Sequence, residues 1–296
     1  MPFKVPVELL RPTSRRGPEW KAWLARLPRL VDDCAARWSL EIVRPLAADH
    51  SLVLEVERGD RTAGVLKLAF PEPEGEHEAE GLRRWNGRSA VRVLEADPAV
   101  GALLLERITP GRQLWRSDEP AAHRVALALL PRLWLPVEDR HPFERVSILA
   151  PRWAARTREL FDATGSPFEP ELADEATRAF AELGGSQDEE VLVHRDFHGG
   201  NVLSAEREPW LVIDPKPTAG ERAFDAAWLL GDRQRIVTAA LARRRLDETV
   251  DTLGLDRGRL RRWTVARYVL GGLWSLEHKG PGKLLIGVAR VYAAIR

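Results

Sequence analysis

Three polar residues in the second half of the chain follow short apolar runs. Asp196 comes three residues after the run 191–193, and Asn201 lies five residues further on. Asp214 directly follows the run 211–213. A carboxylate can orient a hydroxyl group and accept its proton, and amide and carboxylate oxygens are suitable ligands for Mg²⁺. These residue types favour phosphoryl transfer to a hydroxyl, with Asp196 as catalytic base and Asn201 and Asp214 as metal ligands.

Each of these residues has an ordinary explanation when it is considered alone. Asp and Asn are common in turns, where their side chains bond to the nearby backbone. The apolar runs around them predict a β-hairpin, which would bring Asn201 and Asp214 to one end of its strand pair. The three residues together, at this spacing, therefore favour the catalytic interpretation.

The same residues carry a resemblance. Asp196 and Asn201, followed by Ile213-Asp214, resemble the catalytic loop and the metal-binding aspartate of the protein-kinase-like superfamily. Within that superfamily, the segments 198–201 (His-Gly-Gly-Asn) and 214–217 (Asp-Pro-Lys-Pro) resemble the aminoglycoside phosphotransferase family.

The similarity is greatest to the streptomycin 6-kinase and hydroxyurea phosphotransferase branch of that family. In that branch an Ile-Asp-Pro-Lys-Pro run leads to a Gly-Glu-x-x-x-Asp helix start, which here is Gly220 to Asp225. The resemblance covers residues 40–296. It implies an α+β, bilobal protein-kinase-like fold, a small β-rich N-lobe, a larger helical C-lobe, and use of ATP with Mg²⁺.

The resemblance also implies a small-molecule acceptor, either a streptomycin-like aminoglycoside or hydroxyurea, and a role in antibiotic resistance. One alternative is a metabolic kinase for an amino alcohol or a sugar on the same fold. Another is a pseudokinase that binds nucleotide without turnover. The intact set of Lys67, Asp196, Asn201 and Asp214 disfavours a pseudokinase, because pseudokinases commonly lose at least one such residue.

Lys67 lies in the middle of an apolar strand, in a chain where only six of the 45 basic residues are lysines. The resemblance makes it the strand lysine that pairs with a helix glutamate beside the nucleotide phosphates. Glu76, Glu78 and Glu80 are the candidates for its partner. Glu78 is favoured, because it lies four residues before Leu82 on the inward face of the predicted helix.

Other nucleotide contacts leave less trace in the sequence. The apolar strand that contains Leu105 and is followed by Arg107 is the candidate for the adenine contact, by position alone. The turn 46–51 corresponds to the phosphate loop of protein kinases but contains no glycine, although Ser51 could donate to a phosphate.

The acceptor is expected to bind the helical lobe beside Asp196. Glu277 is the single candidate for a substrate carboxylate, because its segment resembles a C-terminal helix of the streptomycin-kinase branch. Only ten residues separate Asp214 from Asp225. This short link leaves no room for a long regulated loop, so phosphorylation of such a loop, to which Arg195 would respond, is not expected, and neither is a protein substrate.

The remaining periodicity predicts two lobes. The first, 1–108, should contain helices and strands at 18–38, 52–56, 63–70, 76–85, 91–96 and 103–106. The second, 109–296, should contain helices at 120–134, 150–164, 170–183, 224–242 and 260–276.

The composition excludes several partners. The chain has 45 basic and 44 acidic residues, with a formal net charge of +1. Binders of nucleic acid or membrane surfaces usually have a strong basic excess, so neither partner is expected. A single cysteine, Cys34, excludes an internal disulfide, and no signal-peptide or membrane-spanning run is present. We therefore expect a cytoplasmic monomer or weak dimer.

Overall fold

The computed structural model of the chain describes residues 5–6, 9, 17–46, 48, 51–72, 75–231 and 237–295. The chain divides into two compact units. The first consists of Met1–Gly111 and Ser204–Ile213, and the second of Arg112–Leu203 and Asp214–Arg296. The predicted boundary after residue 108 is close to the first transition, but the segment 204–213, predicted to lie in the second lobe, belongs to the first unit.

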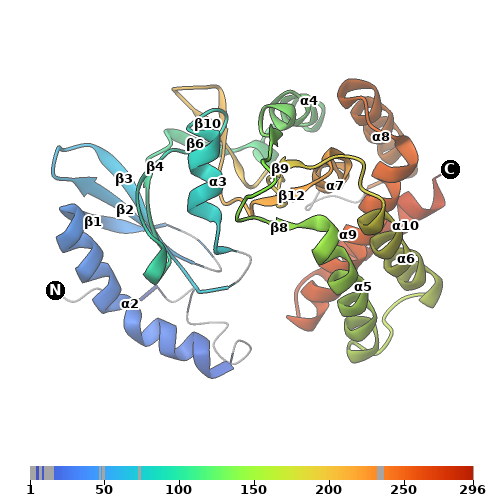
Figure 1. Cartoon of the computed structure of the whole chain (residues 1–296), viewed down its shortest axis with the longest axis horizontal. Helices are drawn as coiled ribbons and strands as arrows, with labels where there is room; N and C mark the ends of the chain where they lie inside the picture. The colour runs from blue at the N-terminus through green and yellow to red at the C-terminus, as the bar shows by residue number, and fades with distance from the viewer. Residues whose placement is uncertain are drawn as a thin grey trace. The chain divides into compact units, whose positions relative to one another are not determined.

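A five-stranded antiparallel sheet forms the centre of the first unit, and Figure 1 shows its strands in blue to green. The strand order is β1-β2-β3-β5-β4. The strands are β1 (Leu40–Leu46), β2 (Ser51–Arg58), β3 (Ala63–Ala69), β4 (Val93–Asp97) and β5 (Ala102–Glu106). The predicted hairpin is confirmed, since β2 and β3 pair from Ser51 opposite Ala69 to Glu57 opposite Ala63.

One face of this sheet packs against α2 (Gly17–Trp38). Apolar residues recur along α2 at helical spacing, and those of β2 alternate between buried and half-buried positions. This is the pattern of an amphipathic helix on a half-buried sheet. Trp20 and Trp23, both buried, pack edge-on against Phe70 after the end of β3, and this cluster forms the core of the first unit.

The other face of β3 carries Lys67. Its neighbours Leu66 and Leu68 belong to the core under α2, and successive side chains of a strand point to opposite faces. Because Glu78, the first residue of α3 (Glu78–Trp85), contacts Lys67, α3 lies against this second face. A short 3-10 helix, η2 (Pro98–Val100), joins β4 to β5.

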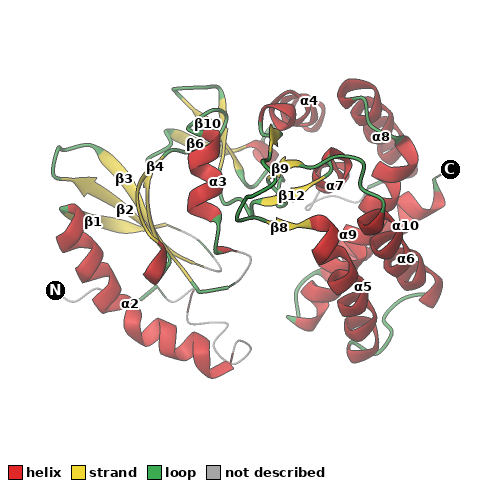
Figure 2. Ribbon diagram, in the orientation of Figure 1, coloured by secondary structure: helices red, strands yellow, loops and turns green. Residues whose placement is uncertain are grey.

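The second unit is mainly helical, as Figure 2 shows, and α9 (Arg257–Glu277) packs against most of its other helices. The others are α4 (Glu119–Leu129), α5 (Val146–Ala163), α6 (Pro170–Gly185), α7 (Arg222–Ala226), α8 (Ala239–Leu253) and α10 (Gly282–Ala294). Its 3-10 helices are η3 (Leu114–Arg116), η4 (Leu130–Arg132) and η5 (Ala227–Leu230). Within the described ranges, no helix combines the length and the apolarity that a bilayer crossing needs.

Two small sheets complete the structure. The first has the order β7-β9-β12-β8, and β9 lies between β7 and β12. Its strands are β7 (Leu135–Pro136), β8 (Glu144–Arg145), β9 (Val191–Val193) and β12 (Thr218–Gly220). The second has the order β11-β10-β6, with strands β6 (Pro110–Gln113), β10 (Val202–Ala205) and β11 (Trp210–Val212).

The single helix predicted for 224–242 is wrong. In the structure, α7 and η5 end at Leu230, and α8 begins only at Ala239. Gly231 follows η5 at a point where the side chain of Tyr268 fills the space that a Cβ would need. The Tyr268 hydroxyl donates to the carbonyl of Trp228 at 2.8 Å, so contact with α9 accompanies the end of this helical segment.

Candidate active site

The loop after β9 positions Asp196 by a tight turn of the backbone. β9 ends at Val193, and the N–H of Asp196 donates to the carbonyl of His194 at 2.8 Å. Arg195, between them, has a φ of 66°, in the left-handed region that few residues other than glycine adopt. Strained backbone of this kind persists only where surrounding contacts enforce it.

Asp225 in α7 supplies those contacts. Its Oδ1 accepts the N–H of Arg195 at 2.7 Å, and its Oδ2 accepts the N–H of His194 at 3.1 Å. The indole N–H of Trp134 donates to the same Oδ2 at 3.0 Å. Asp225 is fully buried, so these charge-assisted bonds satisfy a carboxylate that would otherwise be costly to bury. A residue of the second unit thus holds the backbone just before Asp196.

The carboxylate of Asp196 remains accessible and ionised. Its side chain is 25% exposed. Burial opposes ionisation, but the electrostatic influence of His198, Lys216, His194 and Arg267 outweighs burial and lowers the pKa of Asp196 to about 2. The carboxylate is therefore present at neutral pH in the form that a general base needs.

Asn201 is bonded to Asp196 through its amide nitrogen. Nδ2 donates to the carbonyl of Asp196 at 3.1 Å and approaches its Oδ2 at 3.4 Å. The amide oxygen of Asn201 is consequently the atom suited to bind a cation. The N–H of Asn201 donates to the carbonyl of His198 at 2.9 Å, which closes the loop into one compact turn.

Asp214 follows β11 and also has a positive φ, of 57°. Asp214 is exposed to solvent. Two residues later, the N–H of Lys216 donates to the carbonyl of His194 at 3.0 Å. This bond joins the segment after Asp214 to the loop that carries Asp196. Asn201 and Asp214 each offer an oxygen that can bind Mg²⁺. Two protein ligands suit Mg²⁺, which usually keeps several waters in its coordination sphere.

Two arginines, Arg267 in α9 and Arg195 in the loop itself, make contacts at the backbone and side chains around the loop. The guanidinium of Arg267 in α9 donates to the carbonyl of Arg195, and to the carbonyl of Phe224 at 2.8 Å. Burial lowers the pKa of Arg267 to about 10, so it stays charged at neutral pH. Arg195 lies over the ring of Trp153 at 5.0 Å. Arg195 is buried, so this contact packs its guanidinium within the second unit.

The first unit contains the expected ion pair. Nζ of Lys67 lies 2.7 Å from Oε1 and 2.6 Å from Oε2 of Glu78, and both residues are buried. The other candidate partners lie elsewhere, because Glu80 bonds to Arg84 at 3.3 Å and Glu76 is exposed.

The remaining nucleotide candidates are also in the first unit. Leu105 is buried in β5, and the Arg107 guanidinium donates to the carbonyl of Ile108 at 2.6 Å. Ser51 begins β2 and is half-buried. Within the turn 46–51, residues 47, 49 and 50 lie outside the described residues.

Glu277, the predicted substrate carboxylate, is the last residue of α9. Its two oxygens accept from the guanidinium of Arg156 at 2.8 and 2.9 Å. The Glu277 side chain is 35% exposed, so this ion pair lies at the surface of the second unit and neutralises the charge of the carboxylate.

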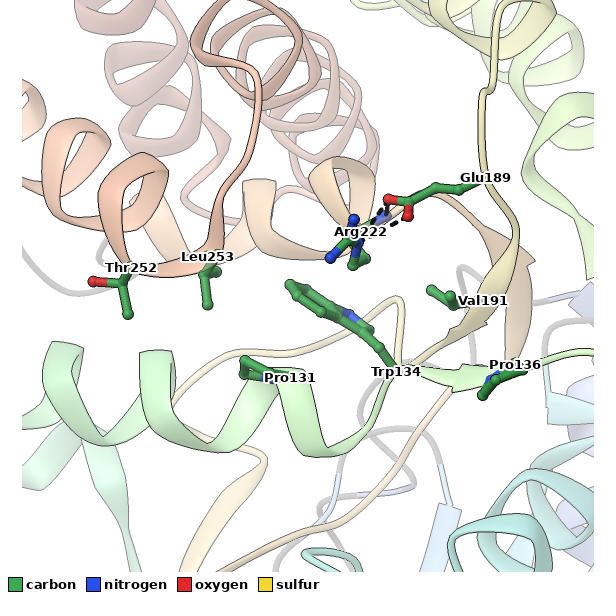
Figure 3. A pocket seen from close by; sticks show the side chains of 8 residues that line it. All are labelled: Pro131, Trp134, Pro136, Glu189, Val191, Arg222, Thr252 and Leu253. Atoms are coloured by element: carbon green, nitrogen blue, oxygen red, sulfur yellow. Dashed lines mark hydrogen bonds and ion pairs between the residues drawn. The ribbon is translucent and has the colours of Figure 1, made fainter.

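A pocket of about 310 Å³ lies at the other end of β9 (Figure 3). Val191, the first residue of β9, lines it together with Trp134, Leu253 and the ion pair of Arg222 with Glu189. Since Asp196 follows the opposite end of the strand, this pocket is separate from the catalytic loop. One lining residue, Trp134, donates the hydrogen bond to Asp225 described above.

Solved structures resemble this chain over most of its length. An aminoglycoside phosphotransferase, determined in ternary complex with ADP and hygromycin B, matches with a TM-score of 0.63 and 13% identity over 89% of this chain and 99% of its own. Choline kinase LicA from Streptococcus pneumoniae matches with a TM-score of 0.61 and 11% identity over 91% of this chain and 100% of its own. The fold is therefore the α+β fold of protein-kinase-like phosphotransferases, as predicted.

The sequence comparisons define the family. The model of the aminoglycoside/hydroxyurea antibiotic resistance kinases matches residues 37–279. Streptomycin 6-kinase from Streptomyces glaucescens is 40% identical over 282 residues, which cover 88% of this chain and 87% of that protein. Hydroxyurea phosphotransferase from Kitasatospora aureofaciens is 36% identical over 279 residues, which cover 93% and 81%. The chain belongs to this family of antibiotic resistance kinases and is an enzyme that transfers a phosphoryl group.

Several residues of the site were not predicted. Asp225 stood in the sequence pattern that identified the branch, and its place at a helix start was the available signal of a role. Trp134 and Arg267 act through contacts distant in sequence, and nothing in their local sequence distinguishes them from core residues.

Proposed function

We propose that the chain transfers the γ-phosphoryl group of ATP to a hydroxyl of a streptomycin-like aminoglycoside, or to the hydroxyl of hydroxyurea, and so confers resistance to that compound. The observation that carries the proposal is the geometry of Asp196. Its carboxylate is accessible and ionised, it is bonded to Asn201, and the backbone before it is fixed by Asp225.

Asp196 orients the acceptor hydroxyl and takes its proton as the oxygen bonds to the γ-phosphorus. The bond between that phosphorus and the bridging oxygen to the β-phosphate breaks, and ADP leaves. Asp196 then releases the proton to water. Its main contribution is to hold the hydroxyl in line, as expected for a loose transition state with little bond formation to the nucleophile.

Asn201 and Asp214 would hold Mg²⁺ through the amide oxygen and the carboxylate. When bound, the ion neutralises the charge of the β- and γ-phosphates. Asn201 has its amide nitrogen committed to Asp196, which orients the oxygen the other way. The same side chain thus links the base to the metal site.

In the first unit, Lys67 would bind the α- and β-phosphates while Glu78 keeps its ammonium group in place. Leu105 and Arg107 would provide the adenine contact, and Ser51 a phosphate contact. Contact of the buried Lys67 ammonium group with both oxygens of Glu78 favours its charged form and fixes its position, which suits it to bind a phosphate group.

Glu277 would bind a cationic group of the acceptor. Because Arg156 already pairs with Glu277, a guanidinium or ammonium group of an aminoglycoside would share the carboxylate with Arg156. Hydroxyurea carries no positive charge and would make no use of it. Glu277→Gln should therefore raise KM for an aminoglycoside and leave KM for hydroxyurea unchanged.

The proposal is tested by incubating the purified chain with ATP and Mg²⁺ and with streptomycin, hydroxyurea, choline or a simple sugar. ADP release is measured by a coupled assay, and the phosphorylated product is identified by mass spectrometry. Turnover with streptomycin or hydroxyurea supports the proposal. Turnover with choline or the sugar alone would replace it by a metabolic kinase, and nucleotide binding without turnover of any acceptor would indicate a pseudokinase.

A further inference from the structure

Trp115 lies in η3 and contacts the segment His198–Gly200. The indole ring stacks on the imidazole of His198, with centroids 5.5 Å apart and planes 17° apart. The N–H of Trp115 donates to the carbonyl of Gly199 at 3.2 Å.

Gln113 joins Trp115 to the same segment. The indole N–H of Trp115 donates to Oε1 of Gln113 at 2.9 Å, and Nε2 of Gln113 donates to the carbonyl of Gly200 at 3.3 Å. The side chain of His198 in turn accepts the N–H of Gly200 on Nδ1 at 3.1 Å. Ring and loop are therefore connected by stacking and by a chain of hydrogen bonds.

Space explains why the segment contains two glycines. A Cβ on Gly200 would lie 2.5 Å from Cη2 and 2.8 Å from Cζ2 of Trp115, closer than real carbon atoms approach. A Cβ on Gly199 would lie 3.0 Å from the backbone nitrogen of Trp115 and 3.1 Å from its Cβ. Neither glycine has a positive φ, so the need for glycine comes from the neighbouring tryptophan and not from the backbone conformation.

We propose that the indole of Trp115 is a positioning residue of the kinase site. It fixes the segment His198–Gly200 and, through it, the Asn201 side chain that faces both Asp196 and the metal. The inference rests on the proposed function, in which Asn201 binds Mg²⁺. Asn201 directly follows Gly200, and its N–H is bonded to the carbonyl of His198, so a shift of the segment moves Asn201 with it.

The test is a double-mutant cycle that combines a substitution of Gly200 with a substitution of Trp115, whose ring contacts it. Gly200→Ala should lower kcat by about 10- to 100-fold, because a displacement of about 1 Å in a positioning element costs that much. It should also reduce the gain in ATP affinity that Mg²⁺ gives, while affinity for ATP in EDTA and KM for the acceptor stay unchanged. Trp115→Ala removes the atoms that a Cβ at 200 would meet, so in that background Gly200→Ala should have less than a twofold effect.

Gly199→Ala is the matched control. Its Cβ meets the backbone and Cβ of Trp115, which alanine retains, so its effect should be the same in both backgrounds. Trp115→Phe keeps a ring over His198 and lacks the outer indole atoms, so it should recover most of the kcat that Trp115→Ala loses. If Trp115→Ala does not fold, the cycle is run in the Trp115→Phe background.

An equal effect of Gly200→Ala with and without the indole would overturn the inference, and so would losses confined to melting temperature. ATP affinity with and without Mg²⁺ is measured by calorimetry and needs no acceptor. Failure of every acceptor in the turnover assay would therefore remove the proposed function without removing the readout of this cycle.

Discussion

The buried pair of Lys67 and Glu78, for which we propose a role in nucleotide binding, also bears on the stability of the first unit. The two side chains are 9% and 6% exposed, and the ammonium group lies within 2.7 Å of both carboxylate oxygens. Removal of one partner leaves a charge buried without compensation, whereas replacement of both by apolar groups of similar size is often tolerated. The effect of this pair on the free energy of unfolding can therefore be measured separately from its proposed effect on ATP affinity.

We expect Lys67→Met to lower the free energy of unfolding by about 3–5 kcal/mol, because it removes the ammonium group that both oxygens of the buried Glu78 carboxylate contact. Lys67→Met with Glu78→Leu should recover most of that loss in urea unfolding. Neither variant should regain affinity for ATP, since the phosphates lose their cation in both. Recovery of ATP affinity in the double variant would contradict the role of Lys67.

The surface pair of Arg158 with Asp174 provides a control for the effect of deleting a charge. Both side chains are more than a third exposed, and exposed pairs contribute little. Asp174→Asn should change the free energy of unfolding by less than about 1 kcal/mol and leave ATP affinity unchanged.

At the scale of elements, α7 fixes the loop after β9 through Asp225. Asp225→Ala would leave the N–H groups of His194 and Arg195 and the indole of Trp134 without their acceptor. Each buried donor left unsatisfied costs about 1–3 kcal/mol. We expect a fall of several kcal/mol in the free energy of unfolding, together with a loss of kcat larger than the loss of ATP affinity. Trp134→Phe removes only one of the three donors and should have a smaller effect on both.

A second element-scale prediction concerns His123, which is buried between α4 and α8. Its Nε2 lies 3.4 Å from Oγ1 of Thr249 and 3.7 Å from a carboxylate oxygen of Glu248. Burial, and then the charge of Arg245, lower the pKa of His123 to about 4. The folded protein thus keeps His123 neutral at pH values where the unfolded chain, with an ordinary histidine pKa near 6.5, already binds a proton.

The neutral state of His123 therefore makes its full contribution to the free energy of unfolding above pH 6.5. That contribution is lost as the pH falls from 6.5 toward 4. The loss is about 1.4 kcal/mol per pH unit within this window. Between pH 7.5 and 5.0, urea unfolding should show a decrease for the natural chain that exceeds the decrease for His123→Asn by about 2 kcal/mol. Equal pH dependence of the two proteins would contradict the buried neutral state.

The elements that the sequence predicts well are those whose pattern is local. The amphipathic spacing of α2, α5 and α6 and the alternation in β2 suffice for their positions. The helix predicted across Gly231 is wrong because a contact with Tyr268 in α9, distant in sequence, accompanies its end.

The residues of the site also differ in whether local sequence or contacts distant in sequence determine their roles. The spacing of Asp196, Asn201 and Asp214 predicts a site for phosphoryl transfer. Lys67 is distinguished from the other lysines by the apolar strand in which it lies. Trp115 was not predicted, because its role depends on how closely its ring approaches Gly200. Asp225 was noted only as part of a pattern, since the two N–H groups it accepts belong to residues 30 and 31 positions earlier.

At the scale of the whole molecule, a ligand that binds only the folded state raises the free energy of unfolding by an amount that grows with the logarithm of the ratio of ligand concentration to Kd. At 100 times the Kd, a ligand adds about 2.7 kcal/mol to the free energy of unfolding. ATP with Mg²⁺ should accordingly raise the melting temperature of the natural chain, and EDTA should remove most of the increase. In Asp214→Ala, ATP should give the same small increase with and without Mg²⁺. A retained Mg²⁺ effect in that variant would contradict a metal-binding role for Asp214.

The central claim is that Asp196 acts on the acceptor while other residues bind the nucleotide. The most direct test compares Asp196→Ala with the natural chain, first in turnover with the acceptor identified by the ADP-release assay and then in calorimetric binding of ATP with Mg²⁺. We predict a loss of kcat of at least about 100-fold, with a Kd for ATP within a few-fold of that of the natural chain. Retained turnover in Asp196→Ala would contradict the account.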